Sequence, residues 1–152
     1  MLIEIQKNIL DIDEGMIAHG VNCQHAMGSG VALAIKTKWS SIYDDYMSNP
    51  CVLGAARTIE VGPNLWVANC YTQEFYGRKS FKYADPRAIY SSLRESLGWL
   101  SMYREKSGKS FSLYMPQIGC GLGGLDYNKE VKPLLEELVW WFPSTDIFVC
   151  SL

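Results

Sequence analysis

The chain has 152 residues, of which 48% are hydrophobic and 20% are charged, so it can bury one core, and a single domain spanning residues 1–152 is expected. Its 14 basic and 16 acidic residues give a net charge of -2, which excludes a broad cationic surface for nucleic acid or anionic lipid. A phosphate-bearing ligand would therefore be held locally, by backbone amides.

The N-terminal stretch MLIEIQKNIL lacks the basic start and long apolar run of a signal peptide, and no apolar run is long enough to span a bilayer. A cytoplasmic protein without membrane contact is expected. The five cysteines are scattered and never form a CxxC pair, which argues against a zinc site and against a disulfide framework. Because His19 and His25 are the only imidazoles, no metal site and no cofactor are predicted.

Strand-like segments occur along the whole chain. Alternating or short apolar runs predict strands at 2–6, 16–21, 57–61, 65–71, 111–115 and 147–150. The turn Gly62-Pro63-Asn64 joins the third and fourth of these segments and predicts a β-hairpin.

Three helices are expected between these strands. The first covers about 31–46, and the third covers about 128–141, where Pro133 is compatible only with the first turn or two. The second begins at Pro86 with Asp85 as its cap, and one stripe of it is apolar: Ile89, Leu93, Leu97, Leu100 and Tyr103. Strands interleaved with helices predict an α/β fold, a three-layer α/β/α sandwich around a central mixed sheet.

Two glycine-containing loops each follow a strand and precede a helix. The first glycine loop (residues 22–30) lies in VNCQHAMGSGVALAI, and the second (residues 117–127) lies in MPQIGCGLGGLDY. At the carboxyl ends of strands in an open α/β sheet, helix N-termini direct unpaired N–H groups outward. Two such loops side by side would form a cleft for a diphosphate. The alternative is that the glycines only shape turns.

Two better-known nucleotide motifs fit less well. Gly119, Gly121 and Gly124 match the dinucleotide pattern GxGxxG, with Asp146 at a suitable distance, but Asp146 begins the last strand and no second nucleotide-binding half follows. No GxxxxGK[ST] motif occurs, so a kinase or NTPase is not favoured.

The stretches NCQHAMGSGVALAI and MPQIGCGLGGLDY resemble the two ligand loops of macro domains, in the branch that includes ADP-ribose-1''-phosphate phosphatases and terminal ADP-ribose protein glycohydrolases. The resemblance runs along nearly the whole chain and implies the macro-domain fold and ADP-ribose as the ligand. It places Asn22 on the distal ribose. The diphosphate would lie between Met27, Gly28, Ser29, Gly30 and Val31 on one side and Gln117, Ile118, Gly119, Cys120, Gly121, Leu122 and Gly123 on the other.

The adenine site departs from the family pattern. Macro domains usually have an aspartate there, whereas this chain has Asn8, followed by Ile9. The carbonyl oxygen of Asn8 can accept a hydrogen bond from the adenine amine, without the strength that a full charge adds. The alternative is that Asn8 is only a turn residue.

The catalytic residues that the resemblance to glycohydrolases implies are absent from this chain. The lysine that it implies has no counterpart in 71–75, and its partner aspartate aligns with Gly123. This leaves Asp126 to orient a water and His25 to donate a proton, which predicts hydrolysis of ADP-ribose-1''-phosphate. The alternatives are that Asp126 caps the third helix, and that His25 is an ordinary loop residue.

Other residues have simpler interpretations. His19 lies between apolar neighbours in a strand and is expected to be a hydrogen-bonded core histidine, and Cys120 is expected to pack under the diphosphate without acting as a nucleophile. Aromatic rings of the segment 72–85 could cover the distal ribose, or Arg78, Lys79 and Lys82 of this segment could bind a phosphate.

Three functions remain open. The favoured one is a monomeric phosphatase that acts on ADP-ribose-1''-phosphate. The rivals are a non-catalytic reader of ADP-ribosylated macromolecules and a glycohydrolase that removes ADP-ribose from protein or nucleic acid.

Overall fold

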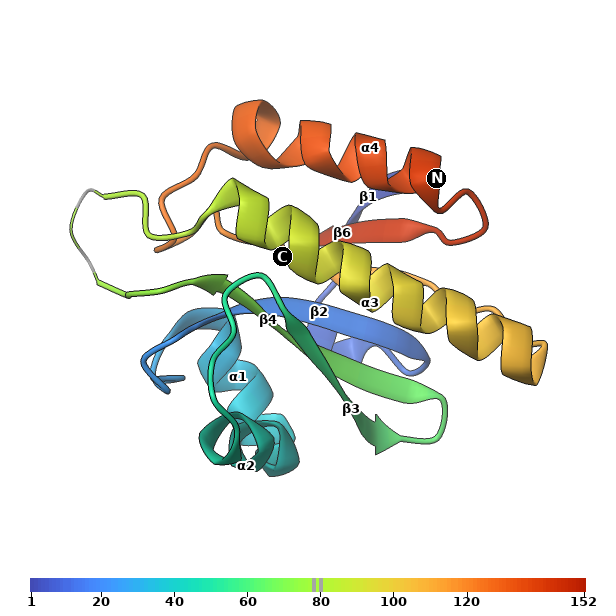
Figure 1. Ribbon diagram of the computed structural model, residues 1–152, viewed down its shortest axis with the longest axis horizontal. Coiled ribbons are helices and arrows are strands. Elements are labelled where there is room, and N and C mark those ends of the chain that lie inside the picture. Colours follow the sequence, from blue (N-terminus) through green and yellow to red (C-terminus); the bar gives the residue numbers. More distant parts are fainter. Residues whose placement is uncertain (78, 80) are drawn as a thin grey trace.

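Six strands form one mixed sheet in the computed structural model, which describes the whole chain except residues 78 and 80 (Figure 1). The spatial order is β1-β6-β5-β2-β4-β3, and only β3 runs antiparallel to its neighbour. The predicted hairpin is confirmed, because β3 pairs with β4 across the turn at Asn64, whose φ is 55°. The strands are β1 (Leu2–Gln6), β2 (Gly15–Asn22), β3 (Ala56–Gly62), β4 (Leu65–Gln73), β5 (Leu113–Met115) and β6 (Ile147–Ser151).

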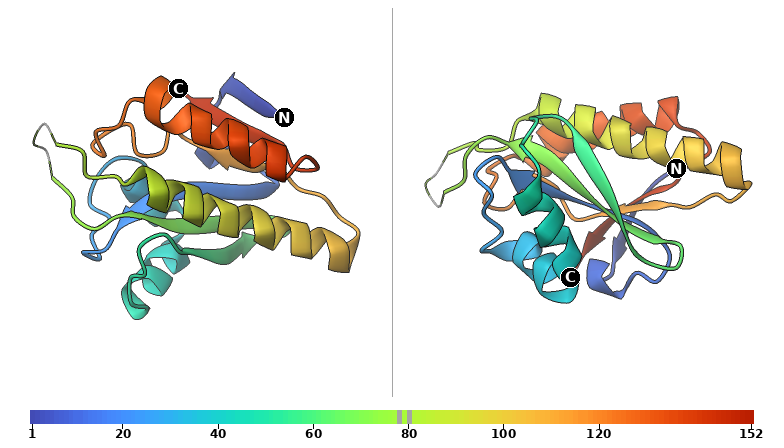
Figure 2. Two further views of the ribbon diagram at one scale, coloured as in Figure 1. Left: turned by 45° about the horizontal axis from the view of Figure 1, so that its top comes forward. Right: turned by 60° about the horizontal axis from the view of Figure 1, so that its bottom comes forward.

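Helices cover both faces of the sheet, which confirms the three-layer α/β/α prediction. Side chains alternate between the faces of a strand, so Met16 and Ala18 of β2 pack towards α3 and α4, while Ile17 and Val21 pack towards α1 and α2. Figure 2 shows α3 and α4 side by side over one face. The helices are α1 (Gly30–Lys38), α2 (Ser40–Ser48), α3 (Pro86–Ser107) and α4 (Lys132–Trp141), with a 3-10 turn at Ile9–Asp11.

The longest helix, α3, starts and packs as its sequence predicts. The Asp85 carboxylate accepts a hydrogen bond from the Arg87 amide at 2.9 Å, and Pro86 is the first helical residue. The predicted apolar stripe faces the core, where Ile89, Leu93 and Leu97 are fully buried.

The predicted helix 31–46 is wrong as one element, because the chain breaks at Trp39. The Trp39 amide closes α1 by donating to the Ile35 carbonyl, but Trp39 itself leaves the helical conformation (φ -129°, ψ 87°), and α2 starts at Ser40. The break turns Ile42 and Tyr46 of α2 into the same apolar cluster as Ile35 of α1.

The third predicted helix begins with a π-helical segment, Tyr127–Val131, and continues as α4. Pro133 lies in the first turn of α4, so the predicted position is confirmed. Among the described residues, no helix is both long and apolar enough to cross a membrane.

The strand order places the two glycine loops together. β2 ends at Asn22 and β5 ends at Met115, and these parallel strands are neighbours in the sheet. Their carboxyl ends therefore open onto the same edge, from which the first loop leads into α1 and the second into α4.

Candidate functional site

A cavity of about 740 Å³ opens at this edge of the sheet, a size typical of small-molecule sites. Both glycine loops line it, together with the ends of β2 and β4. Eleven of the predicted site residues belong to its wall: Asn22, Gly28, Ser29, Gly30, Val31, Gln117, Ile118, Gly119, Gly121, Leu122 and Gly123.

The first glycine loop offers unpaired amides at the start of α1. The Ser29 side chain makes no capping bond, and the first helical bond is donated by Leu33 to the Ser29 carbonyl. Within the described part of the chain, the N–H groups of Gly28, Ser29 and Gly30 have no partner. A helix N-terminus with free N–H groups attracts anions.

The second glycine loop is fixed by its own backbone. The Gly123 carbonyl accepts from the Tyr83 amide at 2.9 Å and from the Ala84 amide at 3.1 Å, which ties the loop to the segment before α3. Gly124 has a φ of 82°, and a side chain there would collide with the carbonyl oxygen of Phe81, so glycine is required. The amides of Gly121, Leu122 and Gly123 make no hydrogen bond with any described residue.

Asn22 stands at the junction of β2 and the first loop. It is 8% exposed, its side-chain amide donates to the Ala26 carbonyl at 2.8 Å, and its side-chain oxygen accepts from the Gln24 amide at 2.9 Å. The second amide hydrogen of Asn22 has no partner among the described residues, so it remains available to a ligand hydroxyl.

Four of the predicted binding residues lie outside the wall of the cavity. Met27 and Ile9 are buried in the apolar cluster under α1 and α2. Asn8 caps the short 3-10 turn, since its side-chain oxygen accepts from the Leu10 amide at 3.0 Å. Cys120 is the fourth residue outside the wall. Burial raises the pKa of its thiol to about 11, and the nearby negative charges of Asp126 and Glu130 act in the same direction, so a thiolate is disfavoured.

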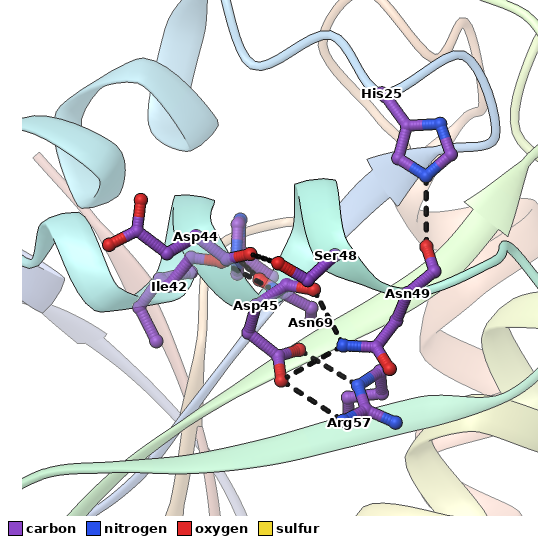
Figure 3. Close-up of polar contacts among 9 residues, drawn as sticks. His25, Ile42, Asp44, Asp45, Ser48, Asn49, Arg57 and Asn69 are labelled. Atoms are coloured by element: carbon purple, nitrogen blue, oxygen red, sulfur yellow. Dashed lines mark hydrogen bonds and ion pairs between the residues drawn. The ribbon is translucent and has the colours of Figure 1, made fainter.

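The two predicted catalytic residues also lie outside the wall. The Asp126 carboxylate accepts from the Lys129 amide at 3.0 Å and caps the π-helical segment. His25 has a φ of 55°, and its Nε2 lies 2.9 Å from the Asn49 carbonyl oxygen, to which it donates (Figure 3). The structure therefore does not bring these side chains together in the cavity, and their catalytic roles stay predictions.

Ten wall residues were not predicted as site residues, and they include three polar side chains at the ends of β2 and β4. His19, Thr72 and Gln73 line the cavity because β2 and β4 are parallel neighbours whose carboxyl ends meet at the same edge. His19 is a core histidine as expected, 1% exposed, with Nε2 donating to Asn69 Oδ1 at 2.6 Å. Burial lowers the pKa of His19 to about 4, so the ring is neutral at pH 7.

The loop that follows β4 contributes to the mouth of the cavity. Tyr76 and Gly77 line it, and Tyr76 is 59% exposed. Lys82 forms an ion pair with Glu130. The phosphate contact proposed for Arg78 lies outside the described residues.

The prediction that cysteines form no disulfide is wrong for one pair. Cys23, the residue after Asn22, is joined to Cys51 after α2, and their Cα atoms are 5.2 Å apart. The sequence did not reveal this pair, because the contact depends on α2 folding back along the first glycine loop. No group of three or more potential metal ligands occurs among the described residues.

No model of a known protein family matches the chain. An uncharacterized 17.5 kDa protein from the tk-vs intergenic region of Enterobacteria phage T4 is 30% identical over 128 residues, which cover 70% of this chain and 69% of that protein.

Solved structures show the fold. The macrodomain of Mycobacterium tuberculosis DarG superposes with a TM-score of 0.82 at 19% identity, covering 100% of this chain and 98% of that one. Thermosipho africanus DarTG in complex with ADP-ribose superposes with a TM-score of 0.68 at 20% identity, covering 91% of this chain and 38% of that one. The chain therefore belongs to the same family as the T4 protein and has the fold of the macro domains.

Proposed function

We propose that the cavity between the two glycine loops binds ADP-ribose. The observation that carries this proposal is the set of unpaired backbone amides on both loops, at Gly28, Ser29 and Gly30 and at Gly121 to Gly123. Such amides suit the oxygens of a diphosphate without the need for a lysine or arginine. The Thermosipho protein, which has the same fold, was solved with ADP-ribose, and this supports the choice of ligand.

The orientation of the ligand follows from the resemblance of the loops. The distal ribose would contact Asn22, whose free amide hydrogen suits a hydroxyl acceptor. Adenine would lie at the opposite end, towards Asn8 and Ile9, a placement that stays a prediction because neither residue lines the cavity.

We further propose that the protein is a hydrolase whose substrate is ADP-ribose-1''-phosphate. The terminal phosphate would lie beyond the distal ribose, near the N-terminus of α1, where a second anion gains from the helix dipole. In this reaction Asp126 would orient the attacking water and His25 would protonate the leaving oxygen. Both roles require the side chains to leave their present contacts with the Lys129 amide and the Asn49 carbonyl.

Phosphate release from ADP-ribose-1''-phosphate tests the proposed reaction, with the purified protein compared with Asp126→Ala and His25→Ala. The proposal predicts turnover by the unmodified protein and at least a roughly hundredfold loss in one of the variants, while both still bind ADP-ribose. Turnover that survives in both variants would exclude these residues from catalysis.

Two other results would redirect the assignment. Binding of ADP-ribose without phosphate release would favour the alternative that the protein is a non-catalytic reader of ADP-ribosylated macromolecules. Release of free ADP-ribose from a modified protein or nucleic acid would identify a glycohydrolase. The predicted monomeric state and cytoplasmic location are part of this proposal and need their own measurements.

A further inference from the structure

A buried tyrosine from α2 contacts the first glycine loop from behind. The Tyr46 hydroxyl lies 2.6 Å from the Asn22 carbonyl oxygen and 2.9 Å from Asn22 Oδ1, and it accepts a hydrogen bond from the Ala26 amide at 3.1 Å. Asn22 and Ala26 both line the cavity, whereas Tyr46 does not. One hydroxyl therefore joins the two ends of the turn that presents Asn22 to the ligand.

The hydroxyl can serve both neighbours only in its neutral form, as donor to Asn22 and acceptor from Ala26. Burial raises the pKa of Tyr46 to about 12, so the neutral form persists at every physiological pH. The side chain is fully buried, and the centroid of its ring is 5.2 Å from that of His25 and 6.2 Å from that of Tyr71. This packing leaves the hydroxyl little freedom to turn away from the loop.

The helix that carries Tyr46 is itself fixed at its C-terminal end. Asn49 donates through its side chain to the Asp45 carbonyl at 2.8 Å, and its own carbonyl accepts from His25 (Figure 3). Asp45 in turn pairs with Arg57 of β3 at 2.8 and 3.0 Å. The C-terminal turn of α2, which carries Tyr46, is therefore held both to β3 and to the first glycine loop.

The contacts determine how Asn22 presents its amide. Asn22 Oδ1 accepts from the Gln24 amide at 2.9 Å and from the Ala26 amide at 3.4 Å, and it shares the single proton of the Tyr46 hydroxyl with the Asn22 carbonyl. The side-chain nitrogen must therefore point the other way, with one hydrogen on the Ala26 carbonyl and one free. Without the hydroxyl, the Asn22 carbonyl would lose this donor and the Ala26 amide would keep only its longer contact with Asn22 Oδ1, at 3.4 Å, so the turn would gain freedom.

We propose that Tyr46 is a positioning residue that fixes the ligand-binding orientation of Asn22 and holds the first glycine loop in place before the ligand arrives. The inference rests on the proposed ADP-ribose site. Tyr46 itself contacts no ligand, so its contribution to affinity would come from holding the site in its binding conformation before the ligand arrives.

Replacement of the hydroxyl tests this role. Tyr46→Phe is expected to raise the dissociation constant for ADP-ribose roughly tenfold, as one lost buried hydrogen-bond partner implies. Tyr43→Phe is the matched control, since it makes the same chemical change on α2 at a hydroxyl that bonds no described residue, and its affinity should stay within roughly twofold of the original. Ile42→Val removes a buried methylene group from α2 and controls for stability alone.

A double-mutant cycle separates positioning from a general loss of stability. If Tyr46 acts through Asn22, Tyr46→Phe should weaken binding less in an Asn22→Ala background than in the original protein. Additive effects, or equal weakening by Tyr46→Phe and Ile42→Val, would overturn the inference.

Amide hydrogen exchange provides a readout that needs no variant. The Ala26 amide should be protected before ADP-ribose is added, because Tyr46 already accepts its hydrogen. Fast exchange of this amide in the free protein would contradict preorganisation even if Tyr46→Phe did not fold. Failure of the unmodified protein to bind ADP-ribose would instead refute the proposed function, so the two failures are distinct.

Discussion

Single residues decide what the cavity can accept. Gly28 and Gly121 line it from opposite loops, and a Cβ built on either one meets no atom of the described residues within 4 Å. Their lack of a side chain is therefore not needed for packing. The open space in front of them is where the oxygens of a diphosphate would approach the backbone.

A methyl group at these positions should block the ligand while leaving the fold intact. Gly28→Ala and Gly121→Ala are each expected to weaken ADP-ribose binding roughly tenfold or more, because the added carbon holds phosphate oxygens away from the amides. Calorimetric titration measures this. Gly98→Ala in α3, where a Cβ also meets nothing within 4 Å, is the control and should bind normally. Normal binding by both cavity variants would mean that the diphosphate lies elsewhere.

His19 should make stability depend on pH. Its pKa falls from 6.5 in the unfolded chain to about 4 in the folded protein, so protons bind preferentially to the unfolded state. The free energy of unfolding is then unaffected by this residue above pH 6.5 and decreases as the pH falls towards 4, by about 3 kcal/mol in total.

Denaturant unfolding between pH 4 and 7 measures this effect. Subtracting the profile of His19→Gln removes the contribution of the carboxylates that both proteins share. A difference that does not change with pH would show that His19 is not buried as a neutral ring.

At the scale of elements, the disulfide links α2 to the first glycine loop. Cys23 and Cys51 are 28 positions apart, and the bond between them closes a loop of this length. Because the bond reduces the conformational entropy of the unfolded chain, it stabilises the folded protein by about 3 to 4 kcal/mol. Reduction, or Cys51→Ser, should lower the free energy of unfolding by that amount. Thiol labelling of the denatured but unreduced protein should show three free cysteines, Cys70, Cys120 and Cys150, and five labelled cysteines would mean that this account of the link is wrong.

Elements with strong local signals could be predicted from the sequence. The cap Asp85, the following Pro86 and a regular apolar stripe define α3, and tight turn residues define the β3–β4 hairpin. The break at Trp39 could not be predicted, because the surrounding residues are compatible with one continuous helix. The break accompanies the packing of Ile35 from α1 and of Ile42 and Tyr46 from α2 into one apolar cluster. Tertiary contacts prevailed there over local preference.

The strand β5 shows the same limit. Phe111 has strand propensity and was predicted to start this strand, but the strand begins at Leu113. The Phe111 ring instead joins an aromatic cluster, 5.1 Å from Trp66 and 5.9 Å from Tyr103. The side chain of Phe111 is thus part of a cluster with residues distant in the sequence, which the local pattern could not reveal.

At the scale of the whole molecule, the sheet order assembles the site. The two glycine loops could be found from the sequence because each carries its own pattern after a strand. His19, Thr72 and Gln73 could not, since they reach the cavity only because β4 lies next to β2. The same holds for Tyr46 and for the Cys23–Cys51 pair, which depend on how α2 packs beside the first loop.

The most direct test of the central claim is calorimetric titration of the purified protein with ADP-ribose, with AMP titrated in parallel. The account predicts saturable binding of one ADP-ribose per chain, and weaker binding of AMP, which lacks the second phosphate and the distal ribose. The absence of binding at ligand concentrations well above those of the protein would contradict the assignment of the cavity between the two glycine loops as an ADP-ribose site.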